Sequence, residues 1–287
     1  MIPFGKHTLH HSYIRSRVEM ALQEDAPTGD ITSETCVDPD VRVDAKIIAK
    51  EEGIVAGTEF AWETFRQCWV KCDVLLEDGS NVKKGDAIIH IHDASARGVL
   101  HAERTALNFM GYLSGIATAA HSFVKAVQGT GVTILDTRKT TPGMRLAEKS
   151  AVRAGGAGNH RAGLSDAILI KENHIRAAGG IRPAVTRALA AADGKDIPLE
   201  VEVTNLSELR DAIEAGAKIV LLDNMHVDGI KMAVEEAKKR GVITEASGNV
   251  SLANVRQIAE TGVGYISIGW ITHSAPALDL SLLIDHK

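Results

Sequence analysis

The sequence of 287 residues contains only three cysteines, Cys36, Cys68 and Cys72, and no CxxC pair. Cys68 and Cys72 are four residues apart, a spacing that would place both on one face of a helix, which is a poor arrangement for a disulfide framework. We therefore expect the three thiols to be reduced and structural.

Long apolar runs are also missing. No stretch approaches the length of a membrane-spanning helix, and the N-terminus, MIPFGKHTLHH, has no apolar signal core. The net charge of −5 disfavours binding to nucleic acid or to an acidic membrane, because neither surface attracts a net anion. We expect a cytoplasmic protein in which any anion site comes from a local concentration of positive charge.

The length suits one large domain or two moderate ones, and the sequence pattern changes along the chain. Residues 12–24 predict a first helix, with Ile14, Val18 and Leu22 on one stripe. Short β segments punctuated by glycines follow at 41–92, with a more helical stretch at 57–69. A long helix is expected at 102–128, with Ser114-Gly115 as a candidate break. The first part of the chain therefore predicts a small mixed domain.

After Gly131, apolar strands alternate with amphipathic helices. Strands are expected at 132–136, 167–171, 199–203, 219–223, 243–247 and 265–269, with helices around 144–154, 180–192, 206–215, 227–240 and 252–261. This alternation predicts βα units and a parallel sheet. Because six strands fall short of eight, we expect an irregular, incomplete α/β barrel, with an open doubly wound sheet as the alternative. No GxGxxG or GxxxxGK[ST] motif follows a strand, so dinucleotide and P-loop sites have no support.

Charged and polar residues gather at the carboxyl ends of these strands, where parallel α/β folds hold their active residues. They are Asp136-Thr137-Arg138-Lys139, Lys171-Glu172-Asn173-His174, Glu200 with Glu202, Asp223-Asn224, Glu245 with Ser247-Gly248-Asn249, and Gly269. From Arg138 to Arg176 there are eight Arg or Lys residues against three Asp or Glu. Bases at separate strand ends converge in space, and Arg and Lys bind carboxylates and phosphates. The sequence therefore predicts a site for a small, multiply anionic ligand.

Glycines accompany these bases. Gly155, Gly156 and Gly158 would either let backbone N–H groups approach a ligand or form a plain flexible loop. Residues 247–249 and Gly269 lie at expected strand-to-helix turns, which is the usual position of a phosphate at a helix N-terminus.

Carboxylates complete the pattern. Glu200 and Glu202 alternate on one strand and so face the same side, with Asp223 one strand away. They fit buried ion pairs, but they also fit ribose hydroxyls, Mg²⁺ with its waters, or stabilisation of a developing cation. His160 and His174 fit both hydrogen-bond donors and packing residues.

At these residues the chain resembles the quinolinate phosphoribosyltransferase family, also called nicotinate-nucleotide pyrophosphorylase (carboxylating). The resemblance covers almost the whole chain, in one order of motifs. They are Glu24-Asp with Gly29-Asp-Ile-Thr32, His101-Ala-Glu-Arg-Thr-Ala-Leu-Asn108, Leu113-Ser-Gly-Ile-Ala-Thr118, Asp136-Thr-Arg-Lys-Thr-Thr-Pro-Gly143, Asn159-His-Arg-x-Gly-Leu164, Leu169-Ile-Lys-x-Asn-His174, Leu222-Asp-Asn-Met225, Glu245-Ala-Ser-Gly248, Tyr265-Ile-Ser-x-Gly269, Thr272-His-Ser-Ala-Pro276 and Leu278-Asp279.

The resemblance implies an α/β fold with a small N-terminal α/β sandwich at 1–115, onto which residues 276–287 pack, and an irregular, incomplete parallel α/β barrel at 116–275. It implies a homodimer or larger oligomer in which one subunit's sandwich helps close the other's site. The implied enzyme is a pentosyltransferase of NAD biosynthesis. It transfers phosphoribose from phosphoribosyl pyrophosphate to quinolinate with decarboxylation, giving nicotinate mononucleotide, pyrophosphate and CO₂, and involves neither nucleic acid nor a membrane.

The resemblance also implies residue roles. The two quinolinate carboxylates would be held by Arg104, donated across the dimer, and by Arg138, His160, Arg161 and Lys171. The expected catalytic residues, which engage phosphoribosyl pyrophosphate, are Lys139, Glu202 and Asp223. Mg²⁺ is the expected cofactor, held by Glu202 and Asp223 directly or through water. The 5′-phosphate would be held by Ser247, Gly248, Gly269 and His273, and Thr137 and Asn249 complete the expected substrate-binding set.

Three positions depart from the family's usual residues. Ala154 replaces a Cys, Gly158 replaces an Arg and Glu172 replaces an Asp. The first two leave the contacts of this loop open, and the third keeps the charge. Two other readings remain: a molybdenum-linked relative of the same family, and a barrel aldolase that uses Lys139 or Lys171 as a Schiff-base lysine. A carrier or binding protein would leave the charged strand ends unexplained.

Overall fold

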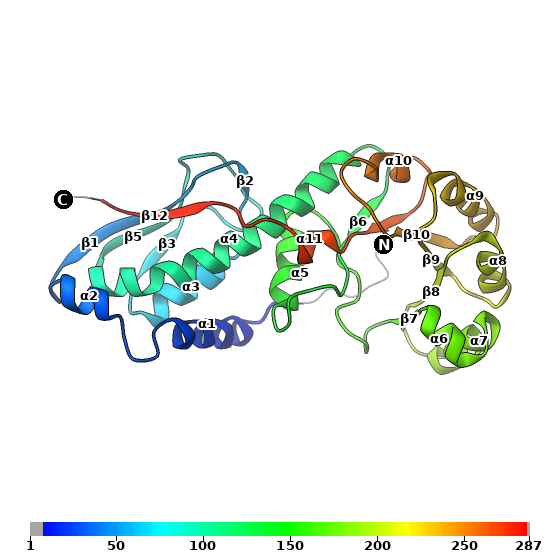
Figure 1. The fold of residues 1–287 in the computed structure, drawn as a ribbon, viewed down its shortest axis with the longest axis horizontal. Coiled ribbons are helices and arrows are strands. Elements are labelled where there is room, and N and C mark those ends of the chain that lie inside the picture. The colour runs from blue at the N-terminus through cyan, green and yellow to red at the C-terminus, as the bar shows by residue number, and fades with distance from the viewer. Residues whose placement is uncertain (1–7, 286–287) are drawn as a thin grey trace. The chain divides into compact units, whose positions relative to one another are not determined.

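The structure is a computed structural model and describes residues 8–285. The chain divides into two compact units, each with its own main sheet (Figure 1). We call residues 8–121, Leu146–Gly156 and 274–285 the sandwich unit, and Ser122–Arg145 with Ala157–His273 the barrel unit. This division places Leu146–Gly156 in the sandwich unit, where the sequence had assigned it to the barrel. The parts of the expected domains at 1–7 and 286–287 lie outside the described residues.

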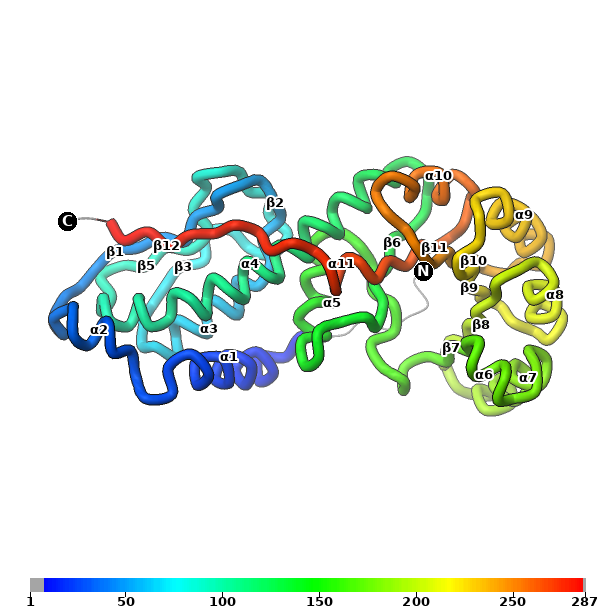
Figure 2. The backbone as a smooth tube through the Cα atoms, viewed as in Figure 1, coloured from blue at the N-terminus to red at the C-terminus, as the bar shows by residue number. Residues whose placement is uncertain are grey.

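The main sheet of the sandwich unit is antiparallel, with strand order β12-β1-β5-β3. Its strands are β1 (Arg42–Ala49), β3 (Cys72–Val74), β5 (Ala87–Ser95) and β12 (Leu280–Asp285), and a small ladder joins β2 (Gly53–Ile54) and β4 (Asn81–Val82). The C-terminal strand β12 pairs with β1, and the two can be followed side by side in Figure 2. From Ala45 onward every second residue of β1 is buried, because alternate side chains of a strand point to one face.

Two helices, α3 (Thr58–Gln67) and the long α4 (Ala96–Ala126), cover this buried face. The other helices of the unit are α1 (His11–Asp25), which contacts α3, α2 (Ile31–Cys36) and α5 (Arg145–Ala154). Phe65 of α3 and Met110 of α4 belong to the same core cluster as Ile47 of β1 and Ile89 of β5. Removing these apolar side chains from water holds helices and sheet together.

The long helix α4 is continuous, so the break considered at Ser114-Gly115 was wrong. The small side chains there serve close packing instead. A Cβ on Gly115 would lie 2.0 Å from the carbonyl oxygen of Pro276, and the Ser114 hydroxyl contacts both backbone groups of Ala56.

We expect Gly115→Ala to destabilise the protein, because a methyl group there collides with backbone rather than with a movable side chain. The free energy of unfolding should fall by roughly 1–3 kcal/mol, as for other overpacked sites. Gly229→Ala in the helix α9 (Val227–Lys238) is the matched control, because its Cβ would meet only the terminal methyl of Met225 at 3.3 Å. Urea unfolding of both variants measures the difference, and equal stability would contradict the packing role of Gly115.

The cysteines are unpaired, as expected, but Cys68 and Cys72 do not share a helix face. The helix α3 ends at Gln67, and Cys72 lies in β3. Burial raises the pKa of the Cys68 thiol to about 11, which keeps this group protonated at neutral pH.

The barrel unit contains six parallel strands in the order β6-β11-β10-β9-β8-β7. The strands are β6 (Thr133–Leu135), β7 (Ile168–Ile170), β8 (Leu199–Val203), β9 (Ile219–Asp223), β10 (Ile243–Ser247) and β11 (Tyr265–Ser267). The helices are α6 (Glu172–Ala178), α7 (Ile181–Ala192), α8 (Leu206–Glu214), α9 (Val227–Lys238), α10 (Val255–Ala259) and α11 (Trp270–His273). The six expected strands are confirmed, whereas α6 was not expected, because Lys171–His174 had been read only as a strand end.

The strand order identifies an incomplete barrel rather than a doubly wound sheet. Neighbours in the sheet are neighbours along the chain, except that the first strand β6 pairs with the last strand β11. The opening lies between β6 and β7, where Gly158 forms a parallel bridge with Leu135. The segment around Gly158 therefore occupies the free edge of β6, which explains why this glycine-rich stretch is ordered and not a plain flexible loop. Within residues 8–285 no helix combines the length and apolar character needed to cross a membrane.

Candidate active site

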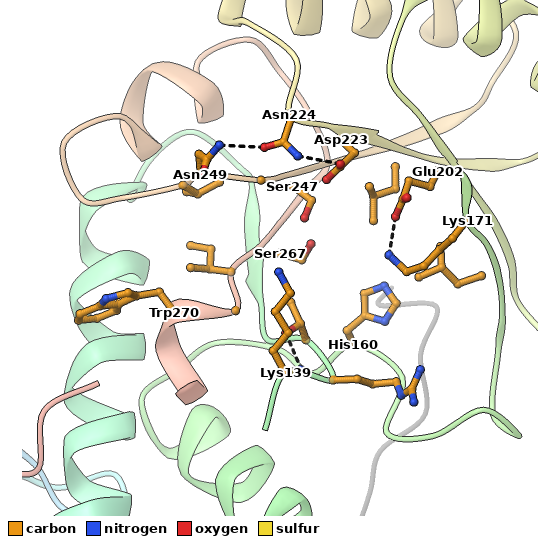
Figure 3. Close-up of a pocket in the computed structure, with 18 of the residues that line it drawn as sticks. Lys139, His160, Lys171, Glu202, Asp223, Asn224, Ser247, Asn249, Ser267 and Trp270 are labelled. Carbon is orange, nitrogen blue, oxygen red and sulfur yellow. Dashed lines mark hydrogen bonds and ion pairs between the residues drawn. The ribbon is translucent and has the colours of Figure 1, made fainter. Parts of the chain in front are cut away.

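One pocket of about 880 Å³ lies at the carboxyl ends of the barrel strands (Figure 3). It is lined by Thr137, Arg138, Lys139, His160, Arg161, Leu169, Lys171, Glu202, Leu221, Asp223, Asn224, Ser247, Gly248, Asn249, Val250, Ser267, Ile268, Gly269, Trp270 and His273. Every residue expected to bind substrate lines this pocket except Arg104, which is exposed on α4 in the sandwich unit. The residues expected at the strand ends therefore meet in one pocket, because parallel strands end at one edge.

Arginine donors form one side of the pocket. Arg161 is buried and donates from Nη1 to the carbonyl oxygen of Ala167 at 2.8 Å. The Nε atoms of Arg138 and Arg161 are also buried, and neither has a hydrogen-bond partner among the described residues. Burial, and then the positive charge of Arg138, lower the pKa of the Arg161 guanidinium. Buried donors without a protein acceptor are costly, so this arrangement fits an anionic ligand.

Asp136 holds the segment that carries these donors. Its side chain is fully buried, and it accepts hydrogen bonds from the backbone N–H of His160 and from Asn159 Nδ2, both at 2.8 Å. Hydrogen bonds to a carboxylate are stronger than those between neutral groups, so Asp136 anchors this segment. The first charged residue of the Asp136–Lys139 motif thus supports the site, whereas the other three line it.

The bases and acids of the pocket meet at one ion pair, in which Lys171 Nζ donates to Glu202 (Figure 3). Lys171 is about half exposed, and Glu202 is mostly covered. His174 does not reach the pocket, since its Nδ1 accepts the backbone N–H of Lys171 at 3.0 Å and so caps α6. Of the two undecided histidines, only His160 belongs to the site.

A second group of polar residues surrounds the end of β9 and β10. Asn224 donates to Asp223 at 2.8 Å and accepts from Asn249 at 3.0 Å, a chain of contacts visible in Figure 3. Asn224 and Asn249 have positive φ angles of 54° and 49°. Gly248 has φ +95°, and a Cβ there would lie 2.2 Å from Asn224 Oδ1. This turn requires glycine for both reasons.

The turn at 247–249 is not followed directly by a helix, because α10 begins only at Val255. The expectation of a phosphate site at that helix N-terminus was therefore wrong, and any anion there would meet the backbone and side chains of the turn itself. Gly269 does directly precede α11, and a Cβ on it would lie 2.9 Å from Lys139 Cδ. The chain must come this close for Thr272 Oγ1 to donate to the Lys139 carbonyl oxygen at 2.7 Å.

The two glutamates of β8 differ in their surroundings. Glu202 lines the pocket, whereas Glu200 is fully buried behind it, next to His160 and Glu245. Burial raises the pKa of Glu200 and of Glu245 to about 8 in each case. The neighbouring Glu200 adds to the shift of Glu245, whereas Lys171 opposes the shift of both. Glu200 is thus a buried group behind the pocket, in contact with His160, and its raised pKa favours the neutral carboxyl at pH 7.

Sequence reasoning did not single out Ser267 and Trp270. Ser267 ends β11, so the strand-end rule would have found it had the strand been ended at 267 instead of 269. Arg104 and His273 had been suggested by resemblance alone. His273 lines the pocket from the end of the short helix α11, where no strand-end pattern could point to it.

Comparison with known protein families decides the relationship. The chain matches the model of the quinolinate phosphoribosyl transferase C-terminal domain over residues 116–283, and that of the N-terminal domain over residues 30–114. The chain belongs to the quinolinate phosphoribosyltransferase family. The two family models together cover most of the sandwich unit and the whole barrel unit, but not the helix α1.

Individual members of the quinolinate phosphoribosyltransferase family agree. A probable nicotinate-nucleotide pyrophosphorylase [carboxylating] of Bacillus subtilis is 40% identical over 276 residues, covering 96% of this chain and 94% of the relative. The chloroplastic enzyme of Oryza sativa is 42% identical over 298 residues, covering 96% and 79%. The structure of the nicotinate-nucleotide pyrophosphorylase from Francisella tularensis matches with a TM-score of 0.90 and 42% identity, covering 97% of this chain and 98% of that one.

Proposed function

We propose that the protein is a decarboxylating quinolinate phosphoribosyltransferase. It transfers phosphoribose from phosphoribosyl pyrophosphate to quinolinate and releases nicotinate mononucleotide, pyrophosphate and CO₂ in NAD biosynthesis. The observation that carries the proposal is the pocket itself. Two arginines present buried Nε donors without protein acceptors on one side, and carboxylates and a glycine turn line the rest.

Quinolinate carries two adjacent carboxylates, and the proposed subsite for it is formed by Arg138, His160, Arg161 and Lys171. Arginine offers planar donors that match a carboxylate, and Lys171 adds a mobile point charge. Exposed Arg104 is proposed to complete this subsite in a partner subunit, as the family resemblance implies. The protein would then act as a homodimer or larger oligomer, in the cytoplasm.

Phosphoribosyl pyrophosphate is proposed to occupy the part of the pocket lined by Lys139, Glu202 and Asp223. Its 5′-phosphate would meet Ser247, Gly248, Gly269 and His273, with Thr137 and Asn249 beside it. Positive φ angles at Gly248 and Asn249 turn the backbone sharply, as in the nests that hold phosphate.

The carboxylates of Glu202 and Asp223 fit Mg²⁺ that keeps most of its water. Mg²⁺ binds oxygen ligands and is usually held by one or two carboxylates together with substrate phosphates. The pocket offers two such carboxylates, Glu202 and Asp223, and Glu202 also forms an ion pair with Lys171. When bound, Mg²⁺ would neutralise charge on the pyrophosphate leaving group.

The residues of the chain would act mainly by orientation and charge. As pyrophosphate leaves C1 of the ribose, the carboxylates of Glu202 and Asp223 would stabilise the positive charge that develops there. The arginines would hold the pyridine ring so that its nitrogen faces C1. Attack gives a positively charged ring nitrogen. The C2 carboxylate then leaves as CO₂, since the electron pair left on C2 lies beside N⁺ and is finally protonated.

The alternative functions are not favoured. The relatives named above are carboxylating nicotinate-nucleotide pyrophosphorylases, not molybdenum-linked proteins or aldolases. A Schiff-base lysine needs a free amine facing the substrate, whereas Lys171 Nζ already donates to Glu202. Failure of borohydride to trap a carbonyl substrate on either Lys139 or Lys171 would exclude the aldolase.

We expect the purified protein to form nicotinate mononucleotide and CO₂ from quinolinate, phosphoribosyl pyrophosphate and Mg²⁺. Because the leaving pyrophosphate needs charge neutralisation, chelation with EDTA should abolish turnover and added Mg²⁺ should restore it. Chromatography of the nucleotide and trapping of ¹⁴CO₂ measure the two products. Turnover of free nicotinate without turnover of quinolinate would reject the decarboxylating assignment.

A further inference from the structure

Three buried side chains, His160, Glu200 and Glu245, meet behind the pocket. His160 Nε2 lies 3.1 Å from Glu200 Oε2 and 3.6 Å from Glu245 Oε1, and both glutamate side chains have no solvent exposure. Within residues 8–285 these are the only three His, Cys, Asp or Glu residues whose ligand atoms lie close enough together to suggest a metal ion. Neither glutamate lines the pocket, so the proposed function gives them no role.

The hydrogen bond on the other ring nitrogen argues against a metal. His160 Nδ1 accepts the backbone N–H of Arg161 at 2.8 Å, so Nδ1 carries no proton. A neutral imidazole keeps one proton, which must then be on Nε2. An Nε2–H group cannot ligate a cation, but it can donate to Glu200 at 3.1 Å. The cluster is therefore a hydrogen-bonded support and not a metal site.

The hydrogen bonds of this cluster connect Glu200 to the arginine side of the pocket. Glu200 holds Nε2, the ring turns Nδ1 toward the peptide N–H of Arg161, and the buried Arg161 side chain lines the pocket. Asp136 fixes the same segment from the other side through the backbone N–H of His160. The imidazole thus lies between a buried carboxyl and the backbone of the arginine, with both of its nitrogens engaged.

We propose that Glu200 is a positioning residue for the carboxylate-binding half of the pocket: it accepts the Nε2–H of His160, and through that ring, whose Nδ1 accepts the Arg161 N–H, it places Arg161. This rests on the proposed function, because the ligand that Arg161 meets is taken to be quinolinate. It also changes the role of His160. The side chain would line the subsite and hold Arg161 in place, and it would not donate to substrate as a charged group.

The acceptor matters here, not the charge. A carboxyl group offers an acceptor oxygen whether it is ionised or protonated, and the amide of glutamine offers one in the same place. Above pH 8, where Glu200 is ionised, removing its negative charge beside Arg161 and Lys171 would by itself strengthen the binding of a dianion. Loss of positioning would weaken it. The two effects have opposite signs, so the variants separate them.

Glu200→Leu removes the acceptor and Glu200→Gln keeps it. For Glu200→Leu we expect the KM for quinolinate to rise by on the order of tenfold, the usual effect of losing one good hydrogen bond, while the KM for phosphoribosyl pyrophosphate changes less than about twofold. Glu200→Gln should restore a KM for quinolinate near that of the unchanged protein. Glu245→Gln is the matched control, since it alters a buried carboxyl 3.6 Å from the same nitrogen. A quinolinate KM that stays the same or falls in Glu200→Leu overturns the proposal.

Nitrogen NMR of protein labelled with ¹⁵N-histidine tests the same contact without activity. His160→Gln assigns the signals by their disappearance. We expect His160 to show a protonated Nε2 and an unprotonated Nδ1 in the unchanged protein and in Glu200→Gln. An Nδ1–H tautomer, or a doubly protonated ring at neutral pH, overturns the proposal even if Glu200→Leu does not fold. If the unchanged protein does not turn over quinolinate, the proposed function fails, and these spectra alone then decide whether Glu200 holds His160.

Discussion

Lys139→Ala should lower kcat/KM for phosphoribosyl pyrophosphate by on the order of 100-fold, the usual loss when a charged group aimed at a developing anion is removed. The KM for quinolinate should change little. Arg138→Ala should give the opposite pattern, with a KM for quinolinate raised roughly 10- to 100-fold, as for a lost charge-assisted hydrogen bond. The two residues are adjacent, yet Arg138 Nε is buried without a protein acceptor, whereas Lys139 is exposed and lies beside Gly269.

Initial rates with each substrate varied in turn measure both patterns. Lys231→Ala is the control, because it removes one exposed positive charge from α9, away from the pocket-lining residues. If Arg138→Ala mainly impaired the use of phosphoribosyl pyrophosphate and Lys139→Ala mainly weakened quinolinate binding, the proposed division of the pocket would be reversed.

Asp223→Asn is the second substitution with a large expected effect. It removes a negative charge from the proposed Mg²⁺ site and keeps the shape of the side chain, so Asn224 still has an oxygen to donate to. We expect kcat to fall by on the order of 100-fold, and the Mg²⁺ concentration for half-maximal rate to rise, because both metal attraction and stabilisation of the ribose cation are weakened.

The dependence of rate on Mg²⁺ concentration is the measurement that identifies the cause. Glu235→Gln on the exposed side of α9 removes one negative charge elsewhere in the barrel unit and should leave both values unchanged. An Asp223→Asn enzyme with a normal Mg²⁺ requirement and a normal rate would remove Asp223 from the proposed site.

The ion pair between Lys171 and Glu202 links the two halves of the pocket. Lys171 is proposed to bind quinolinate and Glu202 to bind the phosphoribosyl donor. Quinolinate would therefore take the place of Glu202 beside Lys171, and the phosphoribosyl donor would take the place of Lys171 beside Glu202. Without substrate, the ion pair gives the mostly covered carboxylate of Glu202 a positive partner. It also gives a reason why Lys171 and Glu202, which are proposed to serve different substrates, lie next to each other.

Local sequence pattern determined much of this protein. Apolar segments alternating with amphipathic helices predicted six parallel strands, and the polar residues at their ends predicted the pocket. Both follow from chain connectivity, since strands joined by helices run in one direction and end at one edge. The identity of the family also came from the sequence, because its motifs extend along nearly the whole chain.

Only the tertiary structure showed which side chains are buried and which distant residues come into contact. Glu200 and Glu202 are two residues apart and looked equivalent, but packing buries the first completely and leaves the second in the pocket. The two ring nitrogens of His160 contact a backbone N–H and the carboxyl of Glu200, which is 40 residues away in the sequence. The close approach of Pro276 to Gly115 likewise joins residues far apart in the chain. Such contacts join residues far apart in sequence, so no local pattern encodes them. The cysteine spacing and the absence of long apolar runs disfavoured a disulfide framework and a membrane-spanning helix. Packing then gave the charged residues their separate places.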